Sequence, residues 1–110
     1  MTSVEITRKN GHIVSVKAEG HTGYGVEGED IVCSALSSVI QTALLGLLRV
    51  AGIAVEYSTD EVNGSLRMNI PSVLSETERH NADIILETML CGIADLHEGY
   101  SDFIELEVKR

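Results

Sequence analysis

Apolar residues stand at alternate positions in two short segments near the start of the chain, the pattern typical of half-buried β-strands. They are Val4 and Ile6 in the first segment, and Val14, Val16 and Ala18 in the second. Between the segments lies Asn10-Gly11, the favoured pair for a two-residue hairpin turn, because both central positions need positive φ. The sequence therefore predicts that the chain begins with a β-hairpin.

A helical pattern starts after Asp30. Apolar residues there recur every three to four positions, at Val32, Leu36, Val39, Ala43 and Leu47, and further apolar residues widen the stripe. Asp30 is expected to be the N-cap, and Gly52 is expected to end the helix. A helix that is apolar on most of its faces must be covered on most of them, so we expect the sheet on one side and another structure on the other.

The second half of the chain repeats this order. Strands are predicted at residues 54–61 and 66–70, with a tight turn at Asn63-Gly64 between them. Ser75-x-x-Glu78 is a capping box, and the helix after it, which ends near Gly99, has one apolar face. That face comprises Ala82, Ile85, Met89, Ile93 and Leu96, and the final strand has Ile104, Leu106 and Val108 at alternate positions. The predicted order is β-β-α-β-β-α-β. It indicates one α+β domain over residues 1–110, sandwich-like, with an antiparallel or mixed sheet and two main helices.

Charge narrows the possible partners. The chain has 8 Lys and Arg against 17 Asp and Glu, a formal net charge of -9, which disfavours direct binding of nucleic acid and favours a basic protein or peptide. The uncharged stretch from Ile31 to Leu48 contains five polar residues, so we interpret it as a buried helix and not as a membrane span. No secretory signal is visible at the N-terminus, so a reducing, cytoplasmic location is expected.

Candidate chemistry is concentrated between Gly20 and Cys33. A thiol attacks as the thiolate, which the partial positive charge of a helix N-terminus stabilises, and Cys33 falls in the first turn of the predicted helix. His21 precedes a glycine-rich loop that would let it fold back and act as general base, while free N–H groups beside Cys33 could form an oxyanion hole. The loop is expected to be mobile and to cover a substrate; its candidate contact residues are Gly23, Tyr24, Gly25, Glu27, Gly28 and Glu29.

Each of these residues also has a structural interpretation. Cys33 could be a small core residue and His21 a hydrogen-bonded surface residue. Asp30 could be only an N-cap and not an orienting group, and the Ser37 hydroxyl could bond to a helical carbonyl instead of reaching the site. Cys91 lies among apolar residues in the middle of the second helix and is expected in the core. The remaining histidines show no metal-ligand spacing, so no metal or other cofactor is expected.

The stretch as a whole resembles a known family. Gly-His-x-Gly-Tyr, a short acidic spacer with glycine, Asp-Ile-Val-Cys and a Ser four residues later are similar to the ribosomal-processing cysteine protease family, Prp. The motif covers residues 20–37, and the order of elements agrees with the family's small α/β fold. The resemblance implies a His21–Cys33 dyad, supporting roles for Gly20, Asp30 and Ser37, and a homodimer. It also implies a substrate, the twenty-seventh protein of the large ribosomal subunit, made with a short N-terminal extension.

A non-catalytic function is the alternative. In this hypothesis the chain is an acidic module that binds a basic ribosomal protein during ribosome biogenesis, and Cys33 is inert. The reactivity of the Cys33 thiol distinguishes the two hypotheses, because a binding module has no need of a stabilised thiolate.

Overall fold

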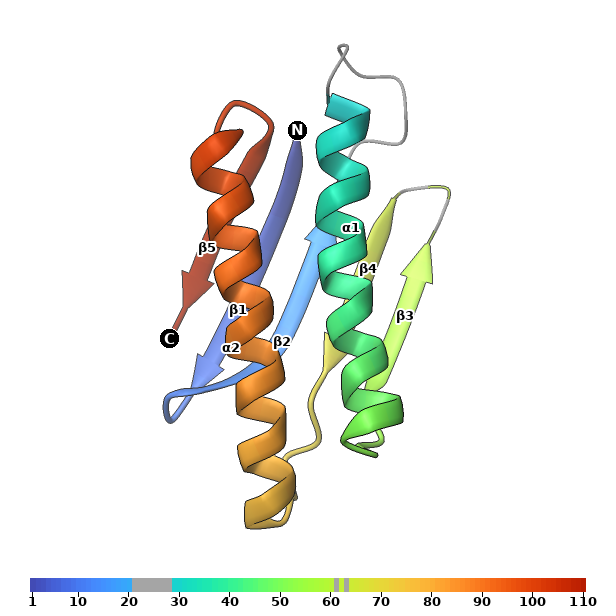
Figure 1. Cartoon of the computed structure of the whole chain (residues 1–110), viewed down its shortest axis with the longest axis vertical. Coiled ribbons are helices and arrows are strands. Elements are labelled where there is room, and N and C mark those ends of the chain that lie inside the picture. Colours follow the sequence, from blue (N-terminus) through green and yellow to red (C-terminus); the bar gives the residue numbers. More distant parts are fainter. Residues whose placement is uncertain (21–28, 61, 63) are drawn as a thin grey trace.

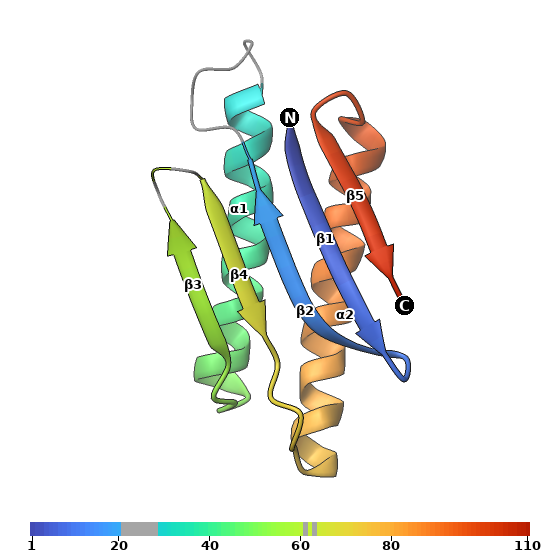
Figure 2. The same cartoon turned by 180° about the vertical axis from the view of Figure 1, so that it is seen from behind.

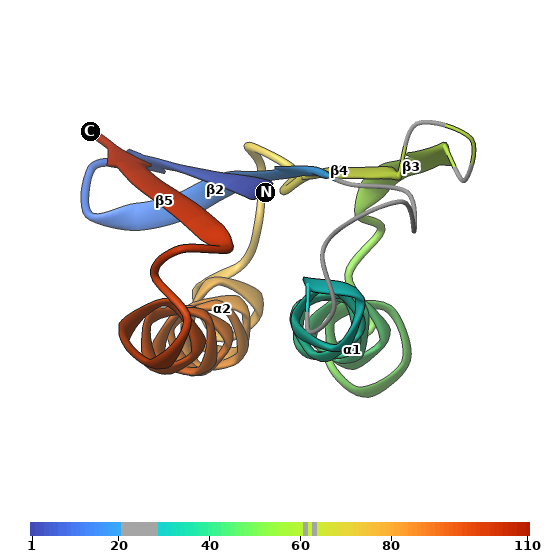
Figure 3. The same ribbon diagram turned by 90° about the horizontal axis from the view of Figure 1, so that it is seen from above.

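The computed structural model describes residues 1–20, 29–60, 62 and 64–110 of the chain. A five-stranded sheet lies on one side, and two long helices lie side by side on the other (Figures 1 and 3). The elements in chain order are β1 (Thr2–Lys9), β2 (His12–Glu19), α1 (Glu29–Leu45), the π-helical turn η1 (Gly46–Val50), β3 (Glu56–Asp60), β4 (Ser65–Asn69), α2 (Glu76–Gly99) and β5 (Ile104–Lys109).

The sheet is mixed. Its strand order is β3-β4-β2-β1-β5, which can be followed across Figure 2. Only the β1–β5 pair is parallel among the described strand pairs, and the other three pairs are antiparallel. The predicted α+β class and the order β-β-α-β-β-α-β are both confirmed.

The predicted hairpin is the centre of this sheet. Asn10 and Gly11 have φ values of 55° and 83°, as a two-residue turn with both central residues at positive φ requires. The second predicted turn contains Gly64 at φ 63°, while Asn63 lies outside the described residues. β3 starts at Glu56, two residues later than predicted, because Ala54 and Val55 belong to the connection that leaves η1.

The core lies between the sheet and the helices and is aliphatic. Val4, Ile6 and Val16 face it from the central strands, and Leu36 and Leu86 face it from the two helices. The opposite face of the sheet carries charged side chains in ion pairs such as Lys17–Glu19 and Lys109–Glu5. One face of the sheet is therefore covered and the other polar, as expected for strands of alternating pattern.

Helix α1 differs from its prediction at the N-terminal end and agrees at the C-terminal end. It begins at Glu29, so Asp30 lies inside the first turn and not at the N-cap position before it. Gly52 has φ 65°, the left-handed conformation that commonly ends a helix, and the predicted stop is confirmed.

The stretch Ile31–Val50 is long and apolar enough to cross a membrane by length and composition, with a mean hydropathy of 2.0. Its inner face is packed in the domain core through Val32, Leu36, Ile40 and Leu44. No described element covers the side of α1 that faces away from the sheet, so the structure that was predicted to cover this side is absent from the described part of the chain (Figure 3).

Helix α2 begins with the predicted capping box. The Glu78 N–H donates to Ser75 Oγ at 3.1 Å, and the Ser75 N–H donates to Glu78 Oε1 at 2.9 Å. The predicted core position of Cys91 is wrong, because its side chain is exposed. Met89 and Ile93 point into the core, and Cys91, two residues from each, lies about 200° around the helix from them.

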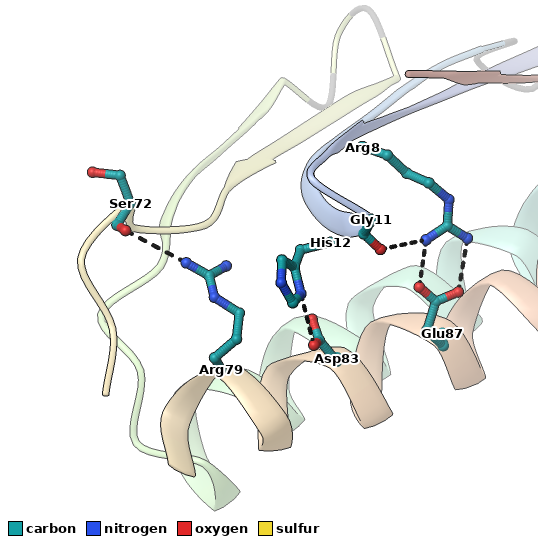
Figure 4. Close-up of polar contacts among 7 residues, drawn as sticks. All are labelled: Arg8, Gly11, His12, Ser72, Arg79, Asp83 and Glu87. Carbon is teal, nitrogen blue, oxygen red and sulfur yellow. Dashed lines mark hydrogen bonds and ion pairs between the residues drawn. The ribbon is translucent and has the colours of Figure 1, made fainter. Parts of the chain in front are cut away.

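Polar contacts fasten the turn end of the β1–β2 hairpin to α2 (Figure 4). Arg8 makes a bidentate pair with Glu87, with Nη2 at 2.8 Å from Oε1, and also donates to the Gly11 carbonyl at 3.2 Å. His12 Nδ1 lies 2.8 Å from Asp83 Oδ2. The hydrogen bonds from Arg8 hold the pKa of the Glu87 carboxyl below its ordinary value.

Candidate active site

Cys33 lies at the end of the molecule where β1 begins, opposite the hairpin turn. It is the fifth residue of α1, and its side chain is half-buried. In Figure 1 the chain's N-terminus lies beside the first turns of α1. Only the first four N–H groups of an α-helix lack partners within the helix, so the Cys33 N–H is outside that free set. The prediction that Cys33 lies in the first turn is therefore corrected by the earlier start of α1.

Among the described residues, β1 provides a polar contact to the thiol. Thr2 Oγ1 lies 2.8 Å from Cys33 Sγ. Thr2 is 7% exposed and is the single buried polar residue among those the structure describes. Thr2 was not among the predicted site residues, although a signal was present: Thr2, Val4 and Ile6 alternate on one face of β1, which places the Thr2 side chain on the core side.

Gly20 lies directly against Thr2. A Cβ atom at Gly20 would be 2.7 Å from Thr2 Oγ1 and 2.9 Å from its Cγ2, distances that no real Cβ contact maintains. The Gly20 N–H also donates to the Gly64 carbonyl at 3.1 Å, which holds the backbone beyond β2 in place. The structure thus explains a glycine at this position by close packing, because any side chain would displace Thr2 or the strand.

A groove of about 810 Å³ extends from Cys33 along α1, between this helix and the β3–β4 side of the sheet. Its floor is apolar, and its rim carries hydroxyl, amide and carboxylate groups. The floor includes Ala18, Leu36, Ile40, Leu44 and Leu66, and the rim includes Ser34, Ser37, Gln41, Tyr57, Thr59 and Asp60. This size and lining suit an extended peptide with apolar side chains.

Ser37 is in this groove with Cys33, one helical turn further along α1. Its side chain is exposed, and its Oγ accepts a hydrogen bond from Gln41 Nε2 at 2.8 Å. The structure therefore brings three of the predicted site residues, Gly20, Cys33 and Ser37, to the same groove.

The other predicted site residues are described partly or not at all. His21, Gly23, Tyr24, Gly25, Glu27 and Gly28 lie outside the described residues. Glu29 and Asp30 form the first two residues of α1. In residues 1–20, 29–60, 62 and 64–110, no three His, Cys, Asp or Glu side chains gather closely enough to hold a metal ion.

Comparison with known sequences identifies the family of the chain. A family model described as "Cysteine protease Prp" matches residues 1–105. A Staphylococcus aureus protein named "Ribosomal processing cysteine protease Prp" is 30% identical over 110 residues, covering 99% of this chain and all of the relative. The Bacillus subtilis protein of the same name is 24% identical over 102 residues, covering 90% of this chain and 91% of its own.

Comparison with solved structures gives the same result. SMU.848 from Streptococcus mutans superposes with a TM-score of 0.87 at 28% identity, covering 99% of this chain and 94% of that one. The S. aureus protease Prp in complex with a substrate peptide superposes with a TM-score of 0.88 at 26% identity, covering 99% of this chain and 100% of that one. A third structure is the S. aureus protease with a covalently linked product peptide, with a TM-score of 0.83 at 27% identity, covering 99% and 100%.

Proposed function

Because the chain belongs to the Prp family of cysteine proteases, we propose that it removes a short N-terminal extension from the twenty-seventh protein of the large ribosomal subunit. Two relatives carry the name ribosomal processing protease, which supports a ribosomal substrate. The net charge of -9 supports it as well, because an acidic enzyme attracts a basic ribosomal protein. The reaction is placed in the cytoplasm, where ribosomal proteins are made.

The observation that carries this proposal is the position of Cys33 at one end of the groove. From Cys33 to Leu45 the groove follows twelve residues of α1, about 18 Å at the helical rise. An extended peptide advances about 3.3 Å per residue, so roughly five residues fit along that length. A short extension with apolar side chains can lie on the groove floor with its scissile bond at the thiol.

His21 and Cys33 form the proposed dyad. His21 takes the thiol proton, and the Cys33 thiolate attacks the scissile carbonyl to form a C–S bond. The C–N bond then breaks as the imidazolium protonates the leaving amine, and water hydrolyses the thioester with His21 as base. The covalently linked product peptide on the S. aureus relative supports such an acyl-enzyme. Side chains and water supply every proton, so the reaction needs no cofactor.

Gly20, Asp30 and Ser37 support the dyad in this proposal. Gly20 leaves room for Thr2 beside the thiol. Asp30, in the first turn of α1, is assigned to stabilise the start of the helix or to orient His21. The Ser37 hydroxyl is assigned to contact the peptide bound in the groove. The stretch containing Gly23, Tyr24, Gly25, Glu27 and Gly28 is assigned to cover the bound peptide; Glu29, predicted with it, is the first residue of α1.

We also propose that the enzyme is a homodimer that uses the outer side of the helical layer. A second cavity, of about 540 Å³, lies there between α1 and α2, and none of its described lining residues is charged. Val50 and Ile84, at its edge, are 85% and 54% exposed. Protomers of charge -9 repel each other least through an uncharged surface. Sedimentation at the mass of two protomers is expected, and a monomer at micromolar concentration contradicts this assignment.

The test of the function is cleavage of the precursor ribosomal protein by the purified chain, followed by mass spectrometry. One cut near the N-terminus is expected, and Cys33→Ala or His21→Ala should abolish it while the variants stay folded. Cys91→Ala is the matched control, because Cys91 is exposed on α2 and its loss leaves no cavity. Continued cleavage by Cys33→Ala contradicts the mechanism. Binding of the precursor without cleavage by the wild type identifies the non-catalytic acidic module instead.

A further inference from the structure

Thr2 is the buried polar side chain of β1, and its hydroxyl contacts the thiol. Thr2, Val4 and Ile6 all face the core, and only Thr2 carries a hydroxyl. A buried hydroxyl costs free energy unless it is hydrogen-bonded, and Val has nearly the same shape without that cost. Two main-chain contacts that do not involve Cys33 fix the backbone of Thr2: its N–H donates to the Phe103 carbonyl at 2.9 Å, and it pairs with Ile104 of β5.

The described surroundings of Cys33 offer little other stabilisation for a thiolate. Cys33 is one turn inside α1, and the field of a helix terminus falls off within the first turn. Of the described residues that line the groove, none is a Lys, Arg or His, so no cationic side chain is present among them. Asp60 on β3 is a carboxylate, whose charge opposes a thiolate. A donated hydrogen bond is therefore the stabilising contact that this part of the groove provides.

We propose that Thr2 is a functional residue of the protease, whose hydroxyl donates a hydrogen bond to the Cys33 thiolate and fixes Sγ at the head of the groove. The proposal rests on the proposed function, since it concerns the nucleophile of that reaction. The 2.8 Å separation is within hydrogen-bond reach, and the low exposure of Thr2, 7%, limits competition from water. The β-branched Thr side chain has few rotamers, so its hydroxyl stays aimed at sulfur.

The experiment measures alkylation of the full-length chain by iodoacetamide from pH 5 to pH 9, with Cys33 and Cys91 resolved by mass spectrometry. Thr2→Val removes the hydroxyl and keeps the shape, Thr2→Ser keeps the hydroxyl, and Thr7→Val makes the same change elsewhere on β1. A hydrogen bond to a charged group is worth about a factor of ten or more in the acid dissociation constant of that group. Thr2→Val should therefore move the midpoint of the Cys33 profile upward by about one pH unit. Thr2→Ser and Thr7→Val should keep the wild-type midpoint, and all variants should unfold near the wild-type Tm.

The outcomes separate this proposal from the function on which it rests. If Thr2→Val keeps the wild-type Cys33 profile, or if Thr2→Ser shifts it as far as Thr2→Val does, the role of the Thr2 hydroxyl is wrong while the protease assignment stands. If wild-type Cys33 reacts no faster than the exposed Cys91 below pH 7, the activated nucleophile itself is wrong. An upward shift in Thr2→Val that Thr2→Ser reverses supports Thr2, because a purely structural role does not move a pH profile.

Discussion

The two ends of the β1–β2 hairpin are held by different kinds of contact. At the turn end, charged side chains reach from the hairpin to α2 and remain partly exposed, as Arg8 and Glu87 do (Figure 4). At the open end, Thr2 leaves no room for a Cβ atom at Gly20, and a hydrogen bond connects Thr2 to Cys33. The turn end is thus held by partly exposed ion pairs, and the open end by close packing beside the thiol.

This difference predicts how each end responds to substitution. Exposed ion pairs contribute little, because water screens them and long side chains lose entropy in forming them. Close packing is less tolerant, since an added methyl group must displace its neighbours. We therefore expect substitutions at the open end to lower the cleavage rate strongly. Substitutions at the turn end should change the free energy of unfolding only weakly.

Gly20→Ala has the largest expected effect. The new Cβ would lie 2.7 Å from Thr2 Oγ1, so the Thr2 hydroxyl must move away from the thiol. We expect a loss of about 1 to 3 kcal/mol in the free energy of unfolding and a loss of roughly tenfold or more in cleavage rate. Urea denaturation and precursor cleavage measure the two quantities.

The control for this change is Gly99→Ala, because a Cβ there has no atom within 4 Å and the backbone is not at positive φ. It should leave both quantities unchanged. The same change can also be made in a Thr2→Ala variant. If Gly20 acts through Thr2, Gly20→Ala should lower the free energy of unfolding and the cleavage rate much less in that variant than in the wild type. Equal losses in the two backgrounds would show that Gly20 acts independently of Thr2.

Glu87→Gln has the smallest expected effect. It removes one charge of the pair with Arg8, and Glu87 is 43% exposed, so we expect a loss of at most about 1 kcal/mol at pH 7 and no change in cleavage. The direction with pH follows from the hydrogen bonds donated by Arg8, which lower the pKa of Glu87 from its ordinary value of 4.5. The stabilisation is therefore present above pH 4.5 and disappears as the pH falls through the lowered pKa.

Urea denaturation of the wild type and Glu87→Gln at pH 7 and below pH 4 tests this direction. The difference in stability should narrow in acid. Glu105→Gln, a change of the same kind at an exposed position of β5, should show no such narrowing. A pH-independent difference would mean that Glu87 stabilises by packing and not by its charge.

Local patterns in the sequence determined most of the fold. Alternation, Asn10-Gly11, the Ser75–Glu78 capping box and Gly52 each encode a local conformation, and the structure has all of them. The face of α2 that is turned toward the core was predicted less well. Leu86 is fully buried, whereas Ile85 was expected at that face, and Cys91 is exposed. A run that is apolar on several sides does not specify which side will meet the sheet, because only the packing of α2 decides it.

The candidate site divides in the same way. The stretch from Gly20 to Cys33 could be recognised in the sequence, because its residues are close together along the chain and their chemistry is local. The pattern places Thr2 on the core side of β1 but does not assign it to the site, since 31 positions separate it from Cys33. The β1–β2 pairing sets the start of β1 beside the end of β2, and only the packing of α1 on the sheet then brings Cys33 to Thr2. The groove likewise exists only after α1 packs on the sheet, because its walls come from segments that are distant in sequence.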